Sequence, residues 1–367
     1  MDILTLLEAG QAEDEFGRIM SNPLAQFGRP DKPFLGLRLM PERLVPLNQY
    51  TEEKINYRTV IANDATDYSP VQIKGSALVG SFDVKLRNSD IGAEFKSSDY
   101  DALLRILRRY QDMDMPMEAM ARLLDWVDKS LNMPLTIKNE KMIWEAIVDA
   151  VIKRRGDNNY EEDVILPNPA GHRVAAGGDW SDDDYNPFDD LYARQQFMAD
   201  KGMDIIRNIA STSVVNKLVN NAKVKTAVGG FVTVSGSGAL MGANGRVTLE
   251  ALNAYLAQDK IAPIQKYDRK YQDQVGSHRF LKEDVFVSIA ETDQSETIDM
   301  GDDEPLTIDE TLGYVGIGTP SGYSDPGKRQ LLKLVDGKAP HIEGQAWQQS
   351  LPVNQNPEAV TVITDIQ

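Results

Sequence analysis

The sequence predicts an α+β protein whose strands and helices are segregated along the chain. Residues 48–95 alternate between apolar and polar, which indicates a long hairpin. Residues 97–155 carry apolar side chains at helical spacing, which indicates a block of helices. Short stretches typical of strands and helices alternate after residue 179 and predict a compact α/β layer.

The first 47 residues are expected to form an arm without a core of its own. Residues 1–22 are compatible with a short acidic helix, but Pro23, Pro30, Pro33 and Pro41 interrupt the segment that follows. Closely spaced prolines prevent a long helix and favour an extended path.

A hairpin is predicted over residues 48–95, with strands at 54–62 and 71–79 and a turn at 63–67. An isolated two-stranded hairpin is only marginally stable in water. We therefore expect it to lie against another surface, which is a neighbouring subunit if the chain's own core lies elsewhere. The candidate contact residues on this hairpin are Tyr57, Arg58, Ile61, Val71 and Ile73.

Three helices are predicted between residues 96 and 178. The first covers Ser98–Tyr110, the second begins at Pro116, and the third is capped by Asn139 and stopped by Gly156. The third, expected over Thr136–Arg155 and about 30 Å long, has the clearest apolar stripe. That stripe should face a sheet formed partly by a strand near Val360. The alternative is that the first helix, Ser98–Tyr110, is the main helix of this block and that the third packs beside it.

Residues 179–344 are expected to form the α/β layer, and residues 345–367 a strand that returns to the helical part of the chain. The predicted helices are Tyr192–Asn208, Ser211–Leu218 and Thr248–Leu256. The predicted strands are Phe231–Val234, Ile261–Tyr267, Phe286–Ile289 and the tail at 359–363, with a flexible acidic loop through Glu304.

Composition excludes several classes of protein. The net charge of −17 disfavours general nucleic-acid binding, because phosphate contacts need clustered Lys and Arg. The absence of cysteine excludes disulfides and thiolate metal sites. No apolar run approaches a membrane span, and the N-terminus lacks the basic start of a signal peptide. We therefore expect a soluble protein made and used in a cytoplasm.

The glycine-rich loop from Gly236 to Gly245 is the one candidate for a nucleotide site. It is expected between a strand and a helix, but Met241 occupies the third glycine position and no phosphate-binding lysine follows. A flexible loop is the favoured interpretation. No cofactor is expected.

No metal or catalytic site is predicted. Asp182, Asp184 and Asn186 mimic a calcium loop, but Pro187 and Ala193 occupy its diagnostic glycine and glutamate positions. The three histidines lack paired spacing and are expected at the surface or in turns; they are His172, His278 and His341.

Two basic clusters are expected at helix C-termini, where they would interact favourably with the helix dipole. They are Arg105, Arg108, Arg109 and Lys153, Arg154, Arg155. The alternative is contact with acidic neighbours or with nucleic acid, and the first three are retained as candidates for contacts between subunits.

Several stretches resemble the lambda-type capsid protein E family of tailed-phage major capsid proteins. Residues 34–41 resemble the approach to that family's long hairpin, and residues 90–95 with 99–104 resemble its exit into helix. Residues 186–191 resemble the Asp-Pro-x-x-Asp-Leu entry to the axial domain, with Asn186 in place of the first Asp. Residues 209–218 also resemble a stretch of the family.

The resemblance implies a Hong Kong 97-like capsid fold. Its parts would be an N-terminal arm (1–47), an E-loop hairpin (48–95), a peripheral domain with a long spine helix (96–178), an axial domain (179–344) and a returning C-terminal strand (345–367). It implies a non-enzymatic protein that forms pentamers and hexamers of an icosahedral head, assembled in the host cytoplasm, with no membrane partner. The expected partners are further copies of the chain, portal and scaffolding proteins, a decoration protein as a further candidate, and double-stranded DNA through weak non-specific contact.

Two rival functions remain open at this point. One is an α/β enzyme that uses the Gly236–Gly245 loop. The other is a different phage structural subunit, such as a tail-tube or decoration protein, because these also use hairpins and arms.

Overall fold

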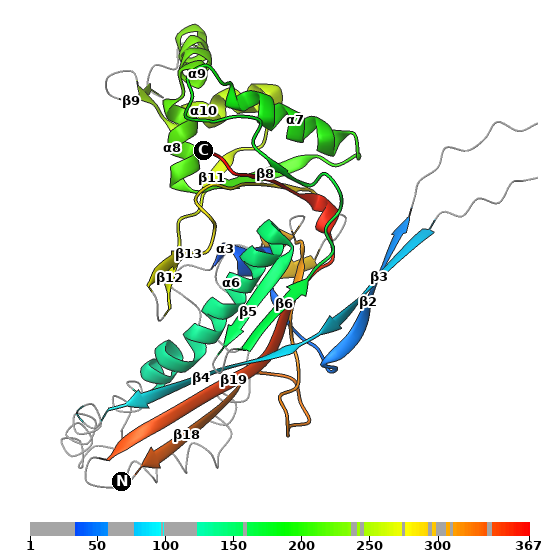
Figure 1. The fold of residues 1–367 in the computed structure, drawn as a ribbon, viewed down its shortest axis with the longest axis vertical. Coiled ribbons are helices and arrows are strands. Elements are labelled where there is room, and N and C mark those ends of the chain that lie inside the picture. Colours follow the sequence, from blue (N-terminus) through cyan, green and yellow to red (C-terminus); the bar gives the residue numbers. More distant parts are fainter. Residues whose placement is uncertain are drawn as a thin grey trace, which may run out of the picture.

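The protein is described from a computed structural model, in which two sheets lie on either side of a long helix and a hairpin extends from the body (Figure 1). The described residues are 34–57, 77–96, 98, 123–156, 160–235, 241–242, 246–273, 276–292, 296–298, 306–308, 311–335 and 340–367. The predicted helix over Ser98–Tyr110 lies outside them except for Ser98, as does the start of the helix at Pro116.

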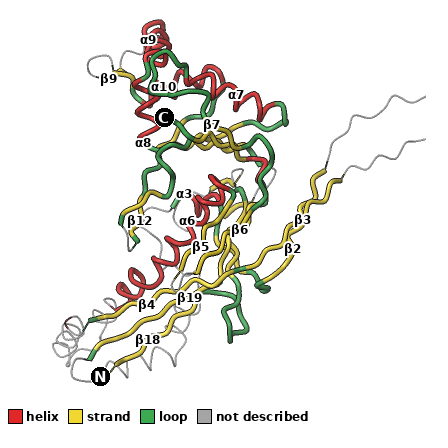
Figure 2. Tube along the Cα trace, viewed as in Figure 1, coloured by secondary structure: helices red, strands yellow, loops and turns green. Residues whose placement is uncertain are grey.

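The first sheet is organised around the 14-residue strand β19 (His341–Asn354). β18 (Arg329–Val335), β17 (Gly313–Ile317) and β4 (Arg87–Phe95) all pair with it antiparallel, and β1 (Glu42–Leu44) pairs parallel with β17. Residues along β19 alternate between buried and more exposed, because successive side chains point to opposite faces of a sheet. The buried face packs against helix α6 (Figure 2).

Helix α6 spans Met133–Asp149 and continues a helical stretch that is described from residue 123 onward and includes a π-helical turn at Asp128–Asn132. It is the longest helix among the described residues. The predicted bounds are wrong at both ends. Asn139 lies buried inside the helix and does not cap it, and the helix ends at Ala150, which adopts a left-handed conformation (φ 53°).

Residues 151–156 form strand β5 (Val151–Gly156), where a continuation of the helix was predicted. β5 pairs with β6 (Tyr160–Ile165) in an antiparallel hairpin. The short apolar run Ala150, Val151 and Ile152 does not distinguish a helix from a strand, and its two β-branched residues favour a strand.

The second sheet has the order β11–β8–β14–β20–β7. Its strands are β11 (Ile264–Lys266), β8 (Ile205–Ala210), β14 (Phe286–Ala290), β20 (Val360–Thr364) and β7 (Arg173–Ala175). Every residue of β14 is buried. Phe286 packs with the helices α8 and α10, whereas its neighbour Val287 joins a cluster with α6, so this sheet is covered on both faces (Figure 1).

The helices α7 (Pro187–Ala199), α8 (Thr212–Asn220) and α10 (Leu249–Leu256) lie over the outer face of the second sheet, and α9 (Ala222–Ser235) packs on α8 and α10 (Figure 1). The predictions for α8 and α10 are confirmed. Ser211 caps α8 by accepting a hydrogen bond from the nitrogen of Val214 at 3.2 Å, and Thr248 caps α10 through that of Ala251 at 3.1 Å.

Two other predictions in this region are wrong. The helix predicted over Tyr192–Asn208 ends at Ala199, because Gly202 takes a left-handed conformation (φ 76°) and β8 follows. The strand predicted at Phe231–Val234 belongs to α9, whose Val224 and Val228 lie one helical turn apart and are buried.

The C-terminal segment divides between the two sheets. Residues 345–354 continue β19 in the first sheet, whereas β20 pairs with β14 and β7 in the second. The expectation that the whole segment returns to the helical part is therefore too simple. Val360 and Val362 nevertheless join Ile143 and Ile147 of α6 in one hydrophobic cluster, so α6 contacts both sheets.

The remaining strands form small antiparallel hairpins. β2 (Gln49–Tyr57) pairs with β3 (Ala77–Lys85), as predicted for the long hairpin. β12 (Lys270–Gln272) pairs with β13 (Ser277–Arg279), β9 (Met241–Gly242) with β10 (Arg246–Val247), and β15 (Glu296–Ile298) with β16 (Leu306–Ile308). Within the described residues, no helix has the length and apolar composition needed to cross a membrane.

Candidate assembly site

The β2–β3 hairpin is attached to the first sheet at its root. The Tyr50 hydroxyl lies 2.8 Å from that of Tyr314 on β17, and the Tyr314 hydroxyl donates to the Glu52 carboxylate at 3.0 Å. Asn48 Nδ2 donates to the Thr319 carbonyl at 2.7 Å, and the Thr319 backbone nitrogen donates to Asn48 Oδ1 at 2.8 Å. Burial, followed by the bond to Tyr50, raises the pKa of Tyr314, which keeps its hydroxyl a donor at neutral pH.

Beyond this root the hairpin extends away from the body (Figure 1). Tyr57 ends strand β2, opposite Ala77 of β3. The other predicted contact residues lie outside the described residues, so their roles remain predictions and the structure brings none of them together. They are Arg58, Ile61, Val71, Ile73, Arg105, Arg108 and Arg109.

The end of the arm is attached to the body through the buried carboxylate of Glu140, on α6. The backbone nitrogens of Gly36 and Leu37, in helix α3 (Leu35–Leu39), donate to it at 2.9 Å each. Trp144 Nε1 donates at 2.7 Å and the Tyr267 hydroxyl at 2.5 Å. One side chain therefore joins the arm, the long helix and the loop between β11 and β12.

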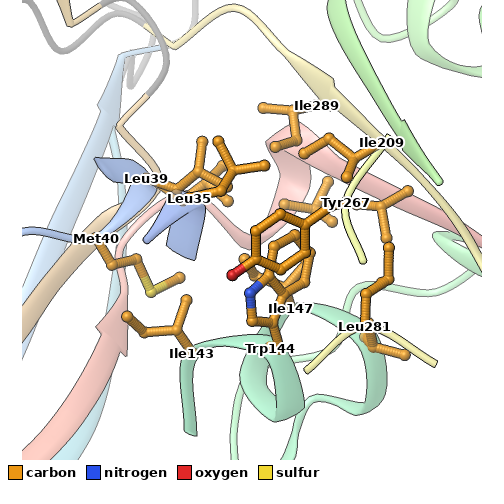
Figure 3. Close-up of a cluster of buried hydrophobic side chains, with 14 of the residues drawn as sticks. Leu35, Leu39, Met40, Ile143, Trp144, Ile147, Ile209, Tyr267, Leu281 and Ile289 are labelled. Atoms are coloured by element: carbon orange, nitrogen blue, oxygen red, sulfur yellow. The ribbon is translucent and has the colours of Figure 1, made fainter. Parts of the chain in front are cut away.

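Aromatic and aliphatic side chains surround this carboxylate. The rings of Trp144 and Tyr267 stack with centroids 4.9 Å apart, beside Leu35, Leu39 and Ile143 (Figure 3). Burial raises the pKa of Glu140, and the hydrogen bonds from Tyr267 and from the backbone and indole donors offset part of that rise.

Sequence reasoning missed Glu140, although a signal was present. Glu140, Ile143 and Ile147 share the helical spacing of the apolar stripe, so a carboxylate stands on the face that the stripe buries. A buried carboxylate requires hydrogen-bond donors from elsewhere in the chain.

A second polar cluster connects β1, α6 and the first sheet. Asn139 Nδ2 donates to Glu42 at 2.6 Å, and Lys328 pairs with the same carboxylate at 2.9 Å. The amide oxygen of Asn139 accepts from Gln348 at 2.8 Å and from Ser350 at 3.0 Å. The role of Asn139 is therefore to link three elements, in place of the predicted cap.

The basic cluster at residues 153–155 lies on β5, so the prediction that it stands at a helix C-terminus is wrong. Arg154 is 3% exposed and donates to the Asn88 carbonyl at 2.6 Å and the Ser350 carbonyl at 3.4 Å, which ties β5 to β4 and β19. Arg155 pairs with Asp163 at 2.7 Å. Only Lys153 of the three is exposed without an ion pair among the described residues.

The histidines and acidic residues do not form a metal site among the described residues. His172 ends the turn that begins at Pro169, in agreement with the prediction of a surface or turn position, but its side chain is buried. Its Nδ1 lies 2.7 Å from the Val360 carbonyl and its Nε2 contacts Lys201. Asp182 accepts a hydrogen bond from the backbone nitrogen of Asp184 at 2.9 Å, an ordinary loop contact.

The structural context predicted for the glycine loop is also wrong. The helix α9, and not a strand, precedes Gly236. Phosphate-binding glycine loops follow a strand and open a helix, which aims the helix N-terminus at the phosphate. Within the loop, the structure describes only Met241 and Gly242, which pair with Val247 and Arg246 in a two-residue ladder.

Comparison with known families identifies the chain. Residues 100–301, more than half of its length, match the model for phage major capsid protein E. The chain belongs to that family. A search of curated proteins returns no match for this capsid protein.

Solved structures agree in fold with this capsid protein. A prophage protein from E. coli CFT073, provisionally described as a capsid protein, is 12% identical with a TM-score of 0.55, and 98% of each chain is covered. A phage-related protein from Bordetella bronchiseptica RB50 is 14% identical with a TM-score of 0.50, over 91% of this chain and 92% of the other.

The fold of the E-family capsid protein is therefore the Hong Kong 97-like capsid fold that the sequence predicted. The protein is a structural component of the phage head and not an enzyme, so the alternative of an enzyme using the Gly236–Gly245 loop is wrong. The match also sets aside the alternative of a tail-tube or decoration subunit.

Proposed function

We propose that copies of this capsid protein assemble into pentamers and hexamers of a closed icosahedral head that encloses double-stranded DNA. The observation that supports this best is the hairpin, which is fixed at Asn48, Tyr50 and Glu52 and extends away from the body. Among the described strands, β2 and the distal part of β3 pair only with each other.

A hairpin of this kind needs an external surface, because two strands alone are marginally stable. Packing it on the next subunit would supply an obligate interface, which typically buries about 2,000–5,000 Å². Closed symmetry then repeats each contact over many copies, so contacts that are weak individually are sufficient to hold the shell together. On this proposal Tyr57, Arg58, Ile61, Val71, Ile73, Arg105, Arg108 and Arg109 contact neighbouring subunits.

The proposed division of the chain follows the expected capsid regions. Residues 1–47 are the arm, 48–95 the E-loop, 96–178 the peripheral domain with α6 as its spine, and 179–344 the axial domain. β4, β17 and β18 pair with β19 and therefore go with the peripheral domain, although they fall within the ranges given for the E-loop and the axial domain. In the C-terminal segment, β19 belongs with the peripheral domain and β20 with the second sheet.

The proposed partners are further copies, scaffolding and portal proteins, a decoration protein as a further candidate, and packaged DNA. The net charge of −17 supports weak, non-specific contact with that DNA, since tight binding requires many phosphate contacts from Lys and Arg. Tight DNA binding by the subunit at physiological salt would contradict this part of the proposal. Assembly is proposed to occur in the host cytoplasm, without a membrane.

Sedimentation of hairpin variants tests the proposal. The double variant Ile61→Asp/Ile73→Asp is expected to remain a soluble subunit, because a carboxylate buried without a partner opposes association. The conservative variant Ile61→Val/Ile73→Val is the control and should sediment as large particles, as the unmodified chain does. Unchanged sedimentation of the aspartate variant, with unchanged circular dichroism, would contradict the role of the hairpin.

A further inference from the structure

A charged groove lies between the spine helix α6 and the β12–β13 hairpin. Its volume is about 460 Å³. Lys141, Glu145 and Asp149 line it from the helix, and Lys270, Tyr271 and Phe280 from the hairpin and the residue that follows. None of the polar clusters described above uses this groove.

The acidic residues of the groove are already paired. Asp149 pairs with Lys282 at 2.6 Å, and Glu145 with Lys141 at 3.8 Å. The third carboxylate, Glu283, pairs with Arg279 at 2.5 Å, and Arg279 also pairs with Asp268 at 2.5 Å.

Two lysines that line the groove have no carboxylate partner among the described residues. Lys153 and Lys270 are exposed and have no ion pair with a described residue. These two lysines place unpaired positive charge in the groove of a chain whose net charge is −17.

The N-terminal arm leaves the described part of the chain at the wall of this groove. The ring of Phe34, the first described residue, lies edge-on to Phe280 with centroids 5.5 Å apart, and the Arg269 guanidinium lies 4.9 Å from the centre of the Phe34 ring. Phe280 lines the groove. The 33 residues before Phe34 therefore start from the groove's edge.

Charge identifies the part of the arm that fits. Residues 2–15 contain five acidic residues and no Lys or Arg. The acidic residues are Asp2, Glu8, Glu13, Asp14 and Glu15.

We propose that residues 2–15 of the arm dock in the groove of their own chain, held by Lys153 and Lys270. The connection from residue 15 to Phe34 spans up to about 60 Å when extended, which allows the segment to fold back. Because the segment is tethered at the groove's edge, its effective concentration there exceeds that of any arm from another copy. This docking is independent of shell assembly and is measured on the unassembled subunit.

The absence of cysteine in the chain makes a cross-linking test clean. Ala12→Cys would be combined with Ser277→Cys, which lies in the groove, in the full-length chain. The control pair combines Ala12→Cys with Thr226→Cys, an equally small, exposed residue on α9. Mild oxidation is followed by denaturing electrophoresis without reductant, which separates a disulfide within one chain from a dimer.

We expect the groove pair to form the disulfide within one chain at least about five-fold faster than the control pair. Adding Lys153→Glu and Lys270→Glu, or about 1 M salt with its Debye length of about 3 Å, should remove that advantage. Adding Lys223→Glu and Lys225→Glu on α9 should leave it intact, with circular dichroism showing that each variant folds. Equal rates for the two pairs, or dimers as the main product, would overturn the proposal.

Discussion

Glu140 Oε1 lies 2.9 Å from the backbone nitrogen of Gly36, a residue 104 positions earlier in the chain. The approach is close enough that a Cβ added at Gly36 would lie 2.6 Å from Glu140 Oε2. The carboxylate also accepts from Leu37, Trp144 and Tyr267, so it cannot move aside without losing hydrogen bonds.

Gly36→Ala is therefore expected to lower the free energy of unfolding by about 1–3 kcal/mol through overpacking. Chemical denaturation of the unassembled subunit measures this. Gly276→Ala is the matched control, because nothing lies within 4 Å of a Cβ at that position. Equal stability of the two variants would show that the arm is not held by Glu140.

Arg154→Met is expected to destabilise the subunit by about 2–3 kcal/mol, since the buried carbonyl of Ser350 and the partly buried carbonyl of Asn88 would lose this donor. Lys153→Met, one residue away and exposed, should change the free energy of unfolding by less than about 0.5 kcal/mol. Thermal and denaturant unfolding check both variants. A larger effect at Lys153 than at Arg154 would contradict the described contacts of β5.

The ion pair between Arg87 and Glu162 predicts a pH dependence. Hydrogen bonds from Arg87, and then from Tyr160, lower the pKa of Glu162 from 4.5 to about 2. A carboxyl whose pKa is lower in the folded state stabilises that state above its ordinary pKa, and the contribution disappears as the pH falls from about 4.5 to 2.

Glu162→Gln should therefore cost about 0.5–1 kcal/mol at pH 7, a modest value because the pair lies near the surface. The difference from the unmodified chain should shrink as the pH is lowered toward 2. Unfolding curves at several pH values provide the measurement. A difference that grows on acidification would show that the assigned ion pair is absent.

Tyr314→Phe removes the hydroxyl that joins Tyr50 to Glu52 at the root of the hairpin. We expect a loss of about 1 kcal/mol per hydrogen bond and faster hydrogen exchange in β2 and β3 than in β19. Tyr323→Phe is the control, because that side chain is exposed and lies outside this network. Equal exchange in the hairpins of the two variants would argue against Tyr314 as its anchor.

Local patterns were sufficient to predict several elements. The helices predicted over Ser211–Leu218 and Thr248–Leu256 are present, and the side chains of Ser211 and Thr248 cap them by accepting from the backbone nitrogens three residues later. The alternation at residues 54–62 and 71–79 likewise predicted a hairpin, of which β2 and β3 are the described part. The capsid fold was implied by the resemblance to the capsid protein E family.

Other features depend on partners far away in the chain, which local patterns do not contain. Asn139 and Glu140 are polar residues on a helix, and their partners Gln348 and Tyr267 are more than 100 positions away. Val151 and Ile152 extend a helical stripe and a strand equally well, so pairing with β6 decides the outcome. The apolar residues around Phe231 fit a strand as well as a helix, and the packing of α9 on α10, which makes this segment helical, cannot be inferred from the local sequence.

The central claim is that this capsid protein closes into a shell through contacts between copies. Negative-stain electron microscopy of the purified, concentrated chain tests it most directly. The account predicts closed particles of uniform size whose surface shows five-fold and six-fold capsomers. Open tubes, isolated rings or single subunits at every concentration would contradict it.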